Sequence, residues 1–179
     1  MPSVGHIAVG LAAARIGQPP AGVRALAWAI LLTIAACLPD VDVVAFTLGI
    51  PYHAPFGHRG AIHSLLFAVI SGVLVGLAAL PLNVPAARMA LAVGMVMATH
   101  GLLDTLTDGG LGVALLWPFS DARYFAPWRP VPVAPIGHRL FEAPGLTLML
   151  NECVLFLPLF LVGLWPRARA AKPRTNGGR

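Results

Sequence analysis

Long apolar runs separated by short polar or proline-rich breaks dominate this chain. The runs that we expect to form helices cover residues 4–16, 25–38 with its continuation 43–50, 61–80, 86–106 and 145–165. A transmembrane helix needs about 20 apolar residues, so the first run is short for a span and the last three are long enough. The segment 109–144 is too rich in proline, glycine and aromatic residues to form a regular span.

Composition places these helices in lipid. The chain has 179 residues, of which 58% are hydrophobic and 11% charged, with a mean hydropathy of +0.80, whereas a soluble domain carries about 25% charged residues. We expect an all-α integral membrane protein, a bundle of about four to five membrane helices formed by residues 1–166, with the lipid bilayer as its surroundings. Cys37 and Cys153 lie inside apolar runs without paired spacing, so we expect them to be core residues.

Positive charge is concentrated at the end of the chain. Five of the twelve basic residues fall in the last thirteen positions, and such a tail beside an apolar segment marks a cytoplasmic flank more often than a nucleic-acid arm. With the tail inside, alternation of the spans puts eight basic residues on the cytoplasmic side and four on the other. We therefore expect residues 167–179 to form a disordered cytoplasmic tail that could bind a cytosolic protein, and we expect no nucleic-acid partner.

The stretch 99–110, reading THGLLDTLTDGG, places His100, Asp104 and Asp108 four residues apart at the end of a long apolar run. Side chains four apart lie on one face of a helix and can converge on one point. Imidazole nitrogen and carboxylate oxygen suit zinc, and oxygen-richer sets suit manganese. The same spacing also occurs in plain pairs on a helix surface, so this stretch alone leaves both interpretations open.

Two further motifs carry ionisable groups beside apolar runs. LPDVD contains Asp40 and Asp42, which either cap the next helix or form part of a site, since two acids beside a membrane span are costly unless paired or coordinated. GHRGAIHS contains His58 and His63 around a helix start, with Arg59 between them. Arg59 either clamps a phosphate or carboxylate with its guanidinium or pairs with one of the aspartates.

These groups gather at one membrane face. Four of the seven acidic residues lie in the three motifs, and four of the six histidines lie there or at the start of the first helix. Under the orientation above, this face is the outward one. Glu152, about seven residues into the last run, either supports the site from behind or pairs with an arginine. We predict a divalent metal site, zinc in the first place and manganese in the second, with these ligands: His6, Asp40, His58, His63, His100 and Asp104.

The order of an early histidine, LPDVD, HRGAIHS, HGLLDTLTDGG and LLWPFSDAR resembles the YdjM-like family of bacterial inner-membrane proteins, described as membrane-bound metal-dependent hydrolases and in part as binding LexA. The resemblance covers about Ser3 to Leu164 and implies an inner-membrane location and hydrolase activity. The family usually has a threonine before its early histidine, where this chain has Gly5. The HxxxD step is also similar to that of zinc-dependent phospholipase C and P1-type nucleases, which favours phosphoester substrates.

The leading hypothesis is a membrane-bound hydrolase of phosphoester or lipid-linked substrates. A bound metal lowers the pKa of water toward 7, and an uncoordinated Asp42 or Asp108 takes the proton while Arg59 holds the anionic group. The alternative is a non-catalytic regulatory or scaffold protein of the LexA-binding type, with a structural metal and a partner on the basic tail. A metal or proton transporter is less favoured, because transport sites lie near the bilayer midplane and these groups lie near helix ends.

Overall fold

The computed structural model describes residues 3–135 and 137–166, and this part of the chain is helical without strands. Two isolated β-bridges, Thr107 with Val131 and Val113 with Tyr124, are the β-type backbone pairings in the described residues. The helices are α1 (Ser3–Gly17), α2 (Ala25–Cys37), α3 (Val44–Thr47), α4 (Leu65–Ala79), α5 (Ala86–Asp104), α6 (Ala143–Leu155) and α7 (Leu157–Leu164), with 3-10 turns at Leu38–Val43, Ala61–His63, Leu80–Leu82 and Gly137–Phe141. The all-α fold class is thus confirmed. The predicted tail, 167–179, lies outside the described residues.

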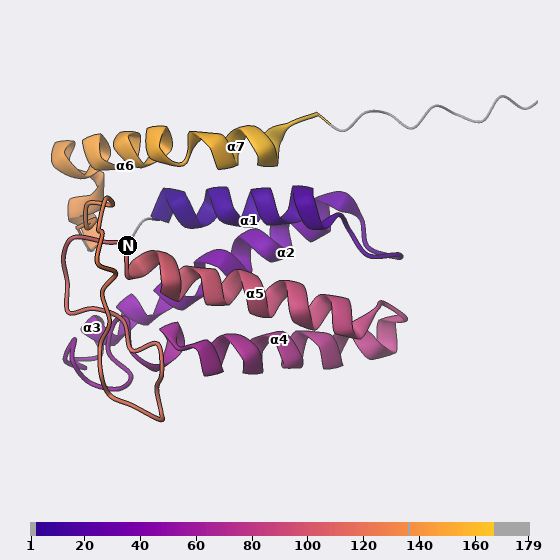
Figure 1. Ribbon diagram of the computed structural model, residues 1–179, viewed down its shortest axis with the longest axis horizontal. Helices are drawn as coiled ribbons and strands as arrows, with labels where there is room; N and C mark the ends of the chain where they lie inside the picture. Colours follow the sequence, from indigo (N-terminus) through magenta and orange to yellow (C-terminus); the bar gives the residue numbers. More distant parts are fainter. Residues whose placement is uncertain (1–2, 136, 167–179) are drawn as a thin grey trace, which may run out of the picture.

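The long helices lie side by side as two hairpins and a bent C-terminal pair. Helix α4 packs on α5, α5 on α2, α2 on α1, and α1 on α7 (Figure 1). The connections 18–24 and 80–85 are short and lie at one end of the bundle, whereas the long connections 38–64 and 105–142 gather at the other. We call this second end the capped end. It contains the last residues of α2 and α5 and the first residues of α1 and α4.

Three helical segments are long and apolar enough to cross a membrane: Ala25–Thr47, Leu65–Leu82 and Ala86–Asp104. The pair α6 and α7 passes the same test together but bends by 65°, and α1 is a shorter apolar helix. The run expected to form the last span, 145–165, thus consists of two helices that meet at a bend and pass the length and hydropathy test only as a pair. Pro158, at the start of α7, has no amide to continue the hydrogen bonding of α6, and the chain turns at Phe156.

Small residues let the helices approach closely. A Cβ on Gly72 of α4 would lie 2.4 Å from the carbonyl oxygen of Ala90 on α5, and one on Gly10 of α1 would lie 2.5 Å from Cα of Thr33 on α2. In lipid, helices associate through such packing, since there is no water to exclude between them. The interior of the α2, α4 and α5 contact is filled by large side chains that include Trp28 and Leu32.

Candidate metal centre

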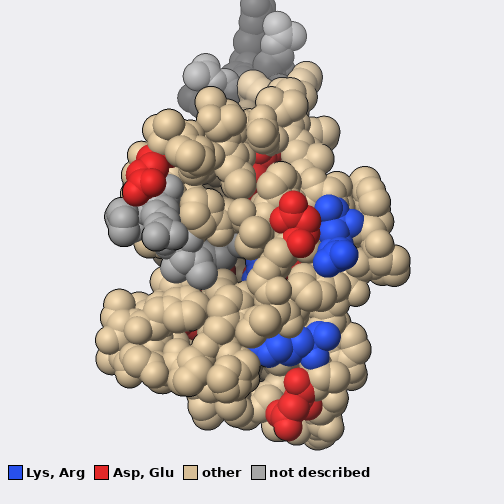
Figure 2. Space-filling view, turned by 90° about the vertical axis from the view of Figure 1, so that its left-hand side faces the viewer, with Lys and Arg blue, Asp and Glu red and all other residues tan. Residues whose placement is uncertain are grey.

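The capped end brings together most of the ionisable groups singled out in the sequence. Asp40 and Asp42 lie in the 3-10 turn that follows α2, His63 in the turn before α4, and His100 and Asp104 in the last two turns of α5. Figure 2 looks onto this end and shows a surface of mostly uncharged residues with separate charged patches. The cluster lies beneath it, because His63, His100 and Asp104 are all buried.

Four side chains direct one donor atom each toward a common point. Nε2 of His63 lies 3.1 Å from Nε2 of His100 and 3.4 Å from Oδ2 of Asp104, and Oδ1 of Asp40 lies 3.6 and 3.5 Å from the two nitrogens. All four donor atoms lie within 4.8 Å of one another. Ligands at about 2.0–2.2 Å from a tetrahedral zinc ion are about 3.3–3.6 Å apart. The spacing therefore fits a tetrahedral divalent ion held by two imidazoles and two carboxylates.

The other ring nitrogens explain why these two imidazoles present lone pairs. Nδ1 of His100 lies 2.6 Å from the carbonyl oxygen of Ala36, which can only accept, so Nδ1 carries the proton. Nδ1 of His63 lies 3.0 Å from Oδ2 of Asp42. When both rings are neutral and carry their proton on Nδ1, two Nε2 lone pairs face each other at 3.1 Å. A cation between them removes this repulsion, and carbonyl or carboxylate partners behind the ring are typical of metal-binding histidines.

The charge balance of the cluster also calls for a cation. With neutral imidazoles, the carboxylates of Asp40, Asp42 and Asp104 and the guanidinium of Arg59 leave a net charge of −2 in a largely buried site. Within the described chain, Oδ1 of Asp40 and both oxygens of Asp104 accept no hydrogen bond. Buried charge without such partners is expensive, so one divalent ion is the natural complement. Burial lowers the pKa of His63, but the carboxylates of Asp104, Asp40 and Asp42 outweigh it and raise that pKa well above its usual value. Without an ion, a proton on His63 therefore offsets part of this negative charge, and a divalent ion that displaces the proton offsets all of it.

Asp42 and His58 lie behind this quartet. Asp42 accepts a hydrogen bond from the backbone amide of Arg59 at 3.0 Å, and its Oδ1 lies 2.6 Å from Nδ1 of His58. Asp42, His58 and His63 are close enough to hold an ion of their own. The 2.6 Å contact is a hydrogen-bond distance, however, and favours Asp42 as the group that orients both imidazoles. The structure thus places His58 beside the quartet and separates it from the common point by Asp42.

His6 lies on the other side of the quartet. Its ring stacks on that of His100 with centroids 3.6 Å apart, and its Nε2 lies 3.4 Å from Oδ1 of Asp104. Glu152 on α6 accepts a hydrogen bond from the amide of Val4 at 3.0 Å and so holds the start of α1 against the site. This assigns Glu152 to support behind the site, one of the two roles that the sequence left open.

Arg59 forms an ion pair with an aspartate, which is one of the two roles that the sequence left open for it. Its Nε lies 3.0 Å from Oδ2 of Asp104, and its Nη1 donates to the hydroxyl of Thr107 and the carbonyl of Gly109 at 2.8 and 3.1 Å. The side chain is fully buried and its φ is +60°, a left-handed conformation that only a well-determined surrounding maintains in a non-glycine residue. Its Nη2 makes no hydrogen bond within the described residues.

Asp108 does not join the cluster. Helix α5 ends at Asp104, and the chain then pairs with 126–131, as the amide of Asp108 donates to the carbonyl of Val131. The exposed carboxylate of Asp108 accepts from the amide of Val133 at 2.7 Å. Asp108 therefore lies off the face of α5 that carries His100 and Asp104, because backbone pairing replaces the next turn of the helix.

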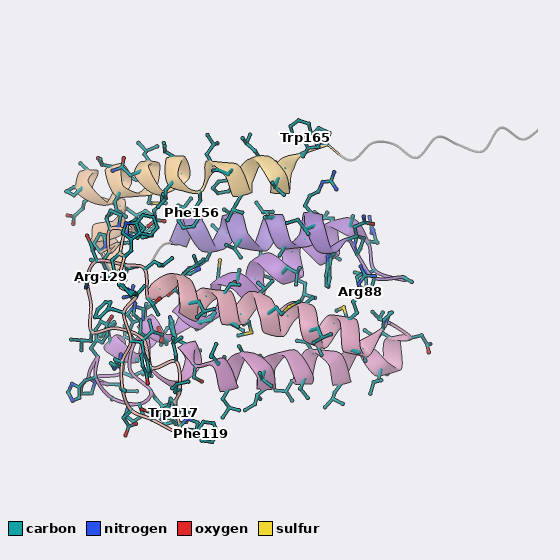
Figure 3. The ribbon with its side chains drawn as sticks, in the orientation of Figure 1. Arg88, Trp117, Phe119, Arg129, Phe156 and Trp165 are labelled. Carbon is teal, nitrogen blue, oxygen red and sulfur yellow. The ribbon has the colours of Figure 1, made fainter. Side chains whose placement is uncertain are left out.

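Several residues that sequence reasoning left without a role shape the site. A Cβ on Gly101 would lie 2.4 Å from the carbonyl oxygen of His63, so glycine beside His100 lets the two ligand segments meet. A Cβ on Gly5 would lie 2.6 Å from the ring of Phe156, which lies between α6 and the start of α1 in Figure 3. The glycine in HGLLD was a visible signal, but the partner that requires it is distant in sequence.

Arg123, in the LLWPFSDAR motif, holds the segment that carries His58 and Arg59 in place by hydrogen bonds. Its guanidinium donates to five backbone carbonyls at 3.1–3.4 Å: those of Tyr52, Ala54, His58, Arg59 and Gly112. Burial lowers the pKa of Arg123. The place of this arginine in the LLWPFSDAR motif was the sequence signal that could have pointed to this role.

Comparisons with known proteins show similarity to inner membrane proteins. The family model described as YdjM inner membrane protein matches residues 1–171. Inner membrane protein YbcI of Escherichia coli (strain K12) is 40% identical over 141 residues, which cover 76% of this chain and 82% of that protein. No solved structure matches the chain.

Proposed function

The chain belongs to the YdjM inner membrane protein family, and from that premise we propose that it is a membrane-bound, metal-dependent hydrolase of phosphoester or lipid-linked substrates. The observation that carries the proposal is the quartet of donor atoms from Asp40, His63, His100 and Asp104 at the capped end of the helices. Two nitrogens and two oxygens suit zinc, with manganese as the second choice. We place this end on the outward face of the inner membrane, with the basic tail in the cytoplasm.

A divalent ion in this quartet would supply a polarised phosphoryl oxygen and a water molecule of lowered pKa. Residues of the chain bind the substrate and orient the imidazoles. Arg59 lies beside the quartet with Nη2 unpaired among the described residues, so it is placed to bind an anionic oxygen of the substrate. Asp42 orients His63 and His58, and Asp40, whose side chain is 11% exposed, is the least buried member of the quartet.

The proton acceptor is better assigned to His6 than to Asp42 or Asp108. The oxygens of Asp42 are already engaged with His58, His63 and a backbone amide, and Asp108 lies outside the cluster. Nε2 of His6 makes no hydrogen bond in the described chain, lies 3.4 Å from Oδ1 of Asp104, and is beside the quartet without belonging to it. A base must be within reach of the site and present a lone pair, which Nε2 does in the tautomer that carries its proton on Nδ1. His6→Ala should therefore abolish turnover while the protein keeps its metal; loss of the metal would make His6 a ligand instead.

The test of the hydrolase uses purified protein and two probes, bis-p-nitrophenyl phosphate and phosphatidic acid. Hydrolysis should disappear on treatment with EDTA, return with added Zn²⁺ or Mn²⁺, and be absent from His100→Ala. His53→Ala is the matched control, since His53 is an exposed loop histidine outside the cluster. Hydrolysis that survives both EDTA and His100→Ala would refute the proposal.

One observation favours a second function, a regulatory or scaffold protein with a structural metal. His100, Asp104 and Arg59 are completely buried, and structural zinc sites are closed whereas catalytic ones keep an open position. On this alternative the purified protein binds metal stoichiometrically, hydrolyses neither probe, and captures a cytosolic protein only when residues 167–179 are present.

A further inference from the structure

An exposed apolar loop lies beside the start of α4 at the capped end. We call residues 115–120, which read LLWPFS and carry no charge, the apolar loop. The amide of Phe119 donates to the carbonyl of Leu116 at 2.9 Å, and this turn leaves the two side chains 83% and 45% exposed. Phe56, 60% exposed, lies with its ring 5.6 Å from that of Trp117 in an edge contact. Large apolar side chains that gather on a surface mark a contact with protein or membrane.

The base of the apolar loop is fixed to the segments that carry the quartet. The amide of Leu65, two residues after His63, donates to the carbonyl of Leu115 at 3.0 Å. A Cβ on Gly101, the residue after His100, would lie 3.2 Å from the side chain of Leu115. The position of the loop along the bundle is therefore tied to that of both imidazoles.

The apolar loop extends the lipid-facing surface of a membrane span. Figure 3 shows Trp117 and Phe119 on the side of α4 that faces away from α5, level with the first turns of α4. The helix that follows exposes a series of apolar side chains at intervals of four residues, Val69, Val73 and Leu77. Because α4 is long and apolar enough to cross a membrane, this exposed surface lies against lipid. The loop thus adds aromatic side chains at the end of a lipid-facing helix.

The length of this span sets the depth of the apolar loop. The segment Leu65–Leu82 has 18 residues, which correspond to about 27 Å at a rise of 1.5 Å per residue. The hydrocarbon core of a bilayer is about 30 Å thick, so Leu65 lies close to one of its edges. Tryptophan is enriched at this boundary, where an apolar ring with a polar N–H meets the headgroups. The exposed Asp121 directly follows the loop, as expected where the chain returns to water.

We propose that the apolar loop inserts into the boundary between lipid headgroups and acyl chains beside α4, and that the quartet consequently lies near the depth of the lipid phosphates. Lipid is favoured over a protein partner as the occupant, because the loop is continuous with a surface that already faces lipid and lies level with its edge. The inference does not require hydrolysis and holds equally for a structural metal.

Depth is measured by attaching nitrobenzoxadiazole to Phe119→Cys in a background of Cys37→Ala and Cys153→Ala. The full chain is placed in vesicles of phosphatidylethanolamine and phosphatidylglycerol with a nitroxide on the fifth or the twelfth acyl carbon. Quenching at Phe119 should be roughly twofold stronger with the shallower nitroxide. A label on Val73→Cys, about 12 Å further along α4, should show the reverse order. Leu116→Cys is a second reporter and should behave as Phe119→Cys does.

Iodide, a quencher confined to water, separates the alternatives. The label at Phe119 should be quenched by iodide several-fold less than free labelled cysteine in solution. Strong quenching by iodide and none by either nitroxide would put the apolar loop in water. Protection from iodide and from both nitroxides would show that a second copy or another protein covers the loop. Either result would overturn the proposal, and neither depends on turnover, so the proposed hydrolase stands or fails separately.

Discussion

At the scale of single residues, the orientation of each imidazole depends on the oxygen atom that lies next to its Nδ1. The carbonyl of Ala36 sets the tautomer of His100, and Asp42 does the same for His63. Sequence reasoning counted Asp42 among the candidate bases as an acid not bound to the metal, but spacing cannot tell whether Asp40 or Asp42 faces the common point. The three-dimensional contacts separate the two, since Asp40 faces Nε2 and Asp42 faces Nδ1 of the same ring.

The role of Asp42 makes a first prediction. Asp42→Asn keeps the shape of the side chain but weakens the contact that holds Nδ1 of His63, so zinc affinity should fall by about 10- to 100-fold, the usual effect of removing a partner behind a metal-bound histidine. Isothermal titration of the purified protein measures this. Asp121→Asn, on the exposed surface of the capped end, is the matched control and should bind zinc as the parent does. An unchanged affinity in Asp42→Asn would contradict the assignment.

The raised pKa of His63 makes a second prediction. Its neighbouring carboxylates favour the protonated ring, and metal can bind Nε2 only after that proton leaves. Because the pKa of His63 lies above the usual 6.5, zinc affinity should rise with pH beyond the point where an ordinary histidine is already neutral, by up to about tenfold per pH unit while one proton is released. Zinc titrations across this pH range should also show proton release in buffers of different ionisation enthalpy. A flat profile above pH 7 would count against competition at His63.

At the scale of elements, the residue at which a helix ends and the distance at which segments pack decide which side chains come into contact. Helix α5 presents His100 and Asp104 on one face, as the four-residue spacing implies, and stops before Asp108 because the chain pairs with 126–131. The glycines of α5 then set its distance from neighbouring segments. Gly101 contacts the turn that carries His63, and Gly94 lies against α4 with room for a methyl group.

This difference between two glycines of one helix makes a third prediction. Gly101→Ala puts a Cβ at 2.4 Å from the carbonyl of His63, so the turn must move and zinc affinity should fall by on the order of tenfold or more. In Gly94→Ala the nearest atom is 3.4 Å away, so affinity and thermal stability should stay close to the parent values. Zinc titration and thermal unfolding in detergent give both quantities. Equal effects of the two substitutions would show that the close approach at Gly101 does not matter.

At the scale of the whole molecule, the centre joins segments that the chain otherwise holds only through loops. The candidate ligand atoms come from the turn after α2, the turn before α4 and the end of α5, and α1 adds His6 beside them, supported by Glu152 of α6. A bound ion would therefore link segments adjoining α2, α4 and α5 at one end of the bundle. Without it, three carboxylates would repel one another in a buried site.

Removal of metal makes the fourth prediction. A ligand that binds only the folded state stabilises it by about 4 kcal/mol when its free concentration is a thousand times its Kd. Chelation should therefore lower the Tm of the parent protein by several degrees. Chelation should leave the Tm of His100→Ala unchanged, since that variant has no metal to lose. A Tm that responds equally in both proteins would place the metal elsewhere.

The sequence alone determined the all-α membrane bundle, because apolar runs of about 20 residues can satisfy their backbone in lipid only as helices. It also determined which groups are candidates, since acids and imidazoles beside such runs need partners. The tertiary structure decided which of these candidates share one point: Asp40, His63, His100 and Asp104 do, Asp42 and Arg59 lie behind them, and Asp108 lies outside. The reason is physical, because convergence depends on where α5 ends and how closely Gly101 approaches His63, and both are set by contacts between residues far apart in the chain.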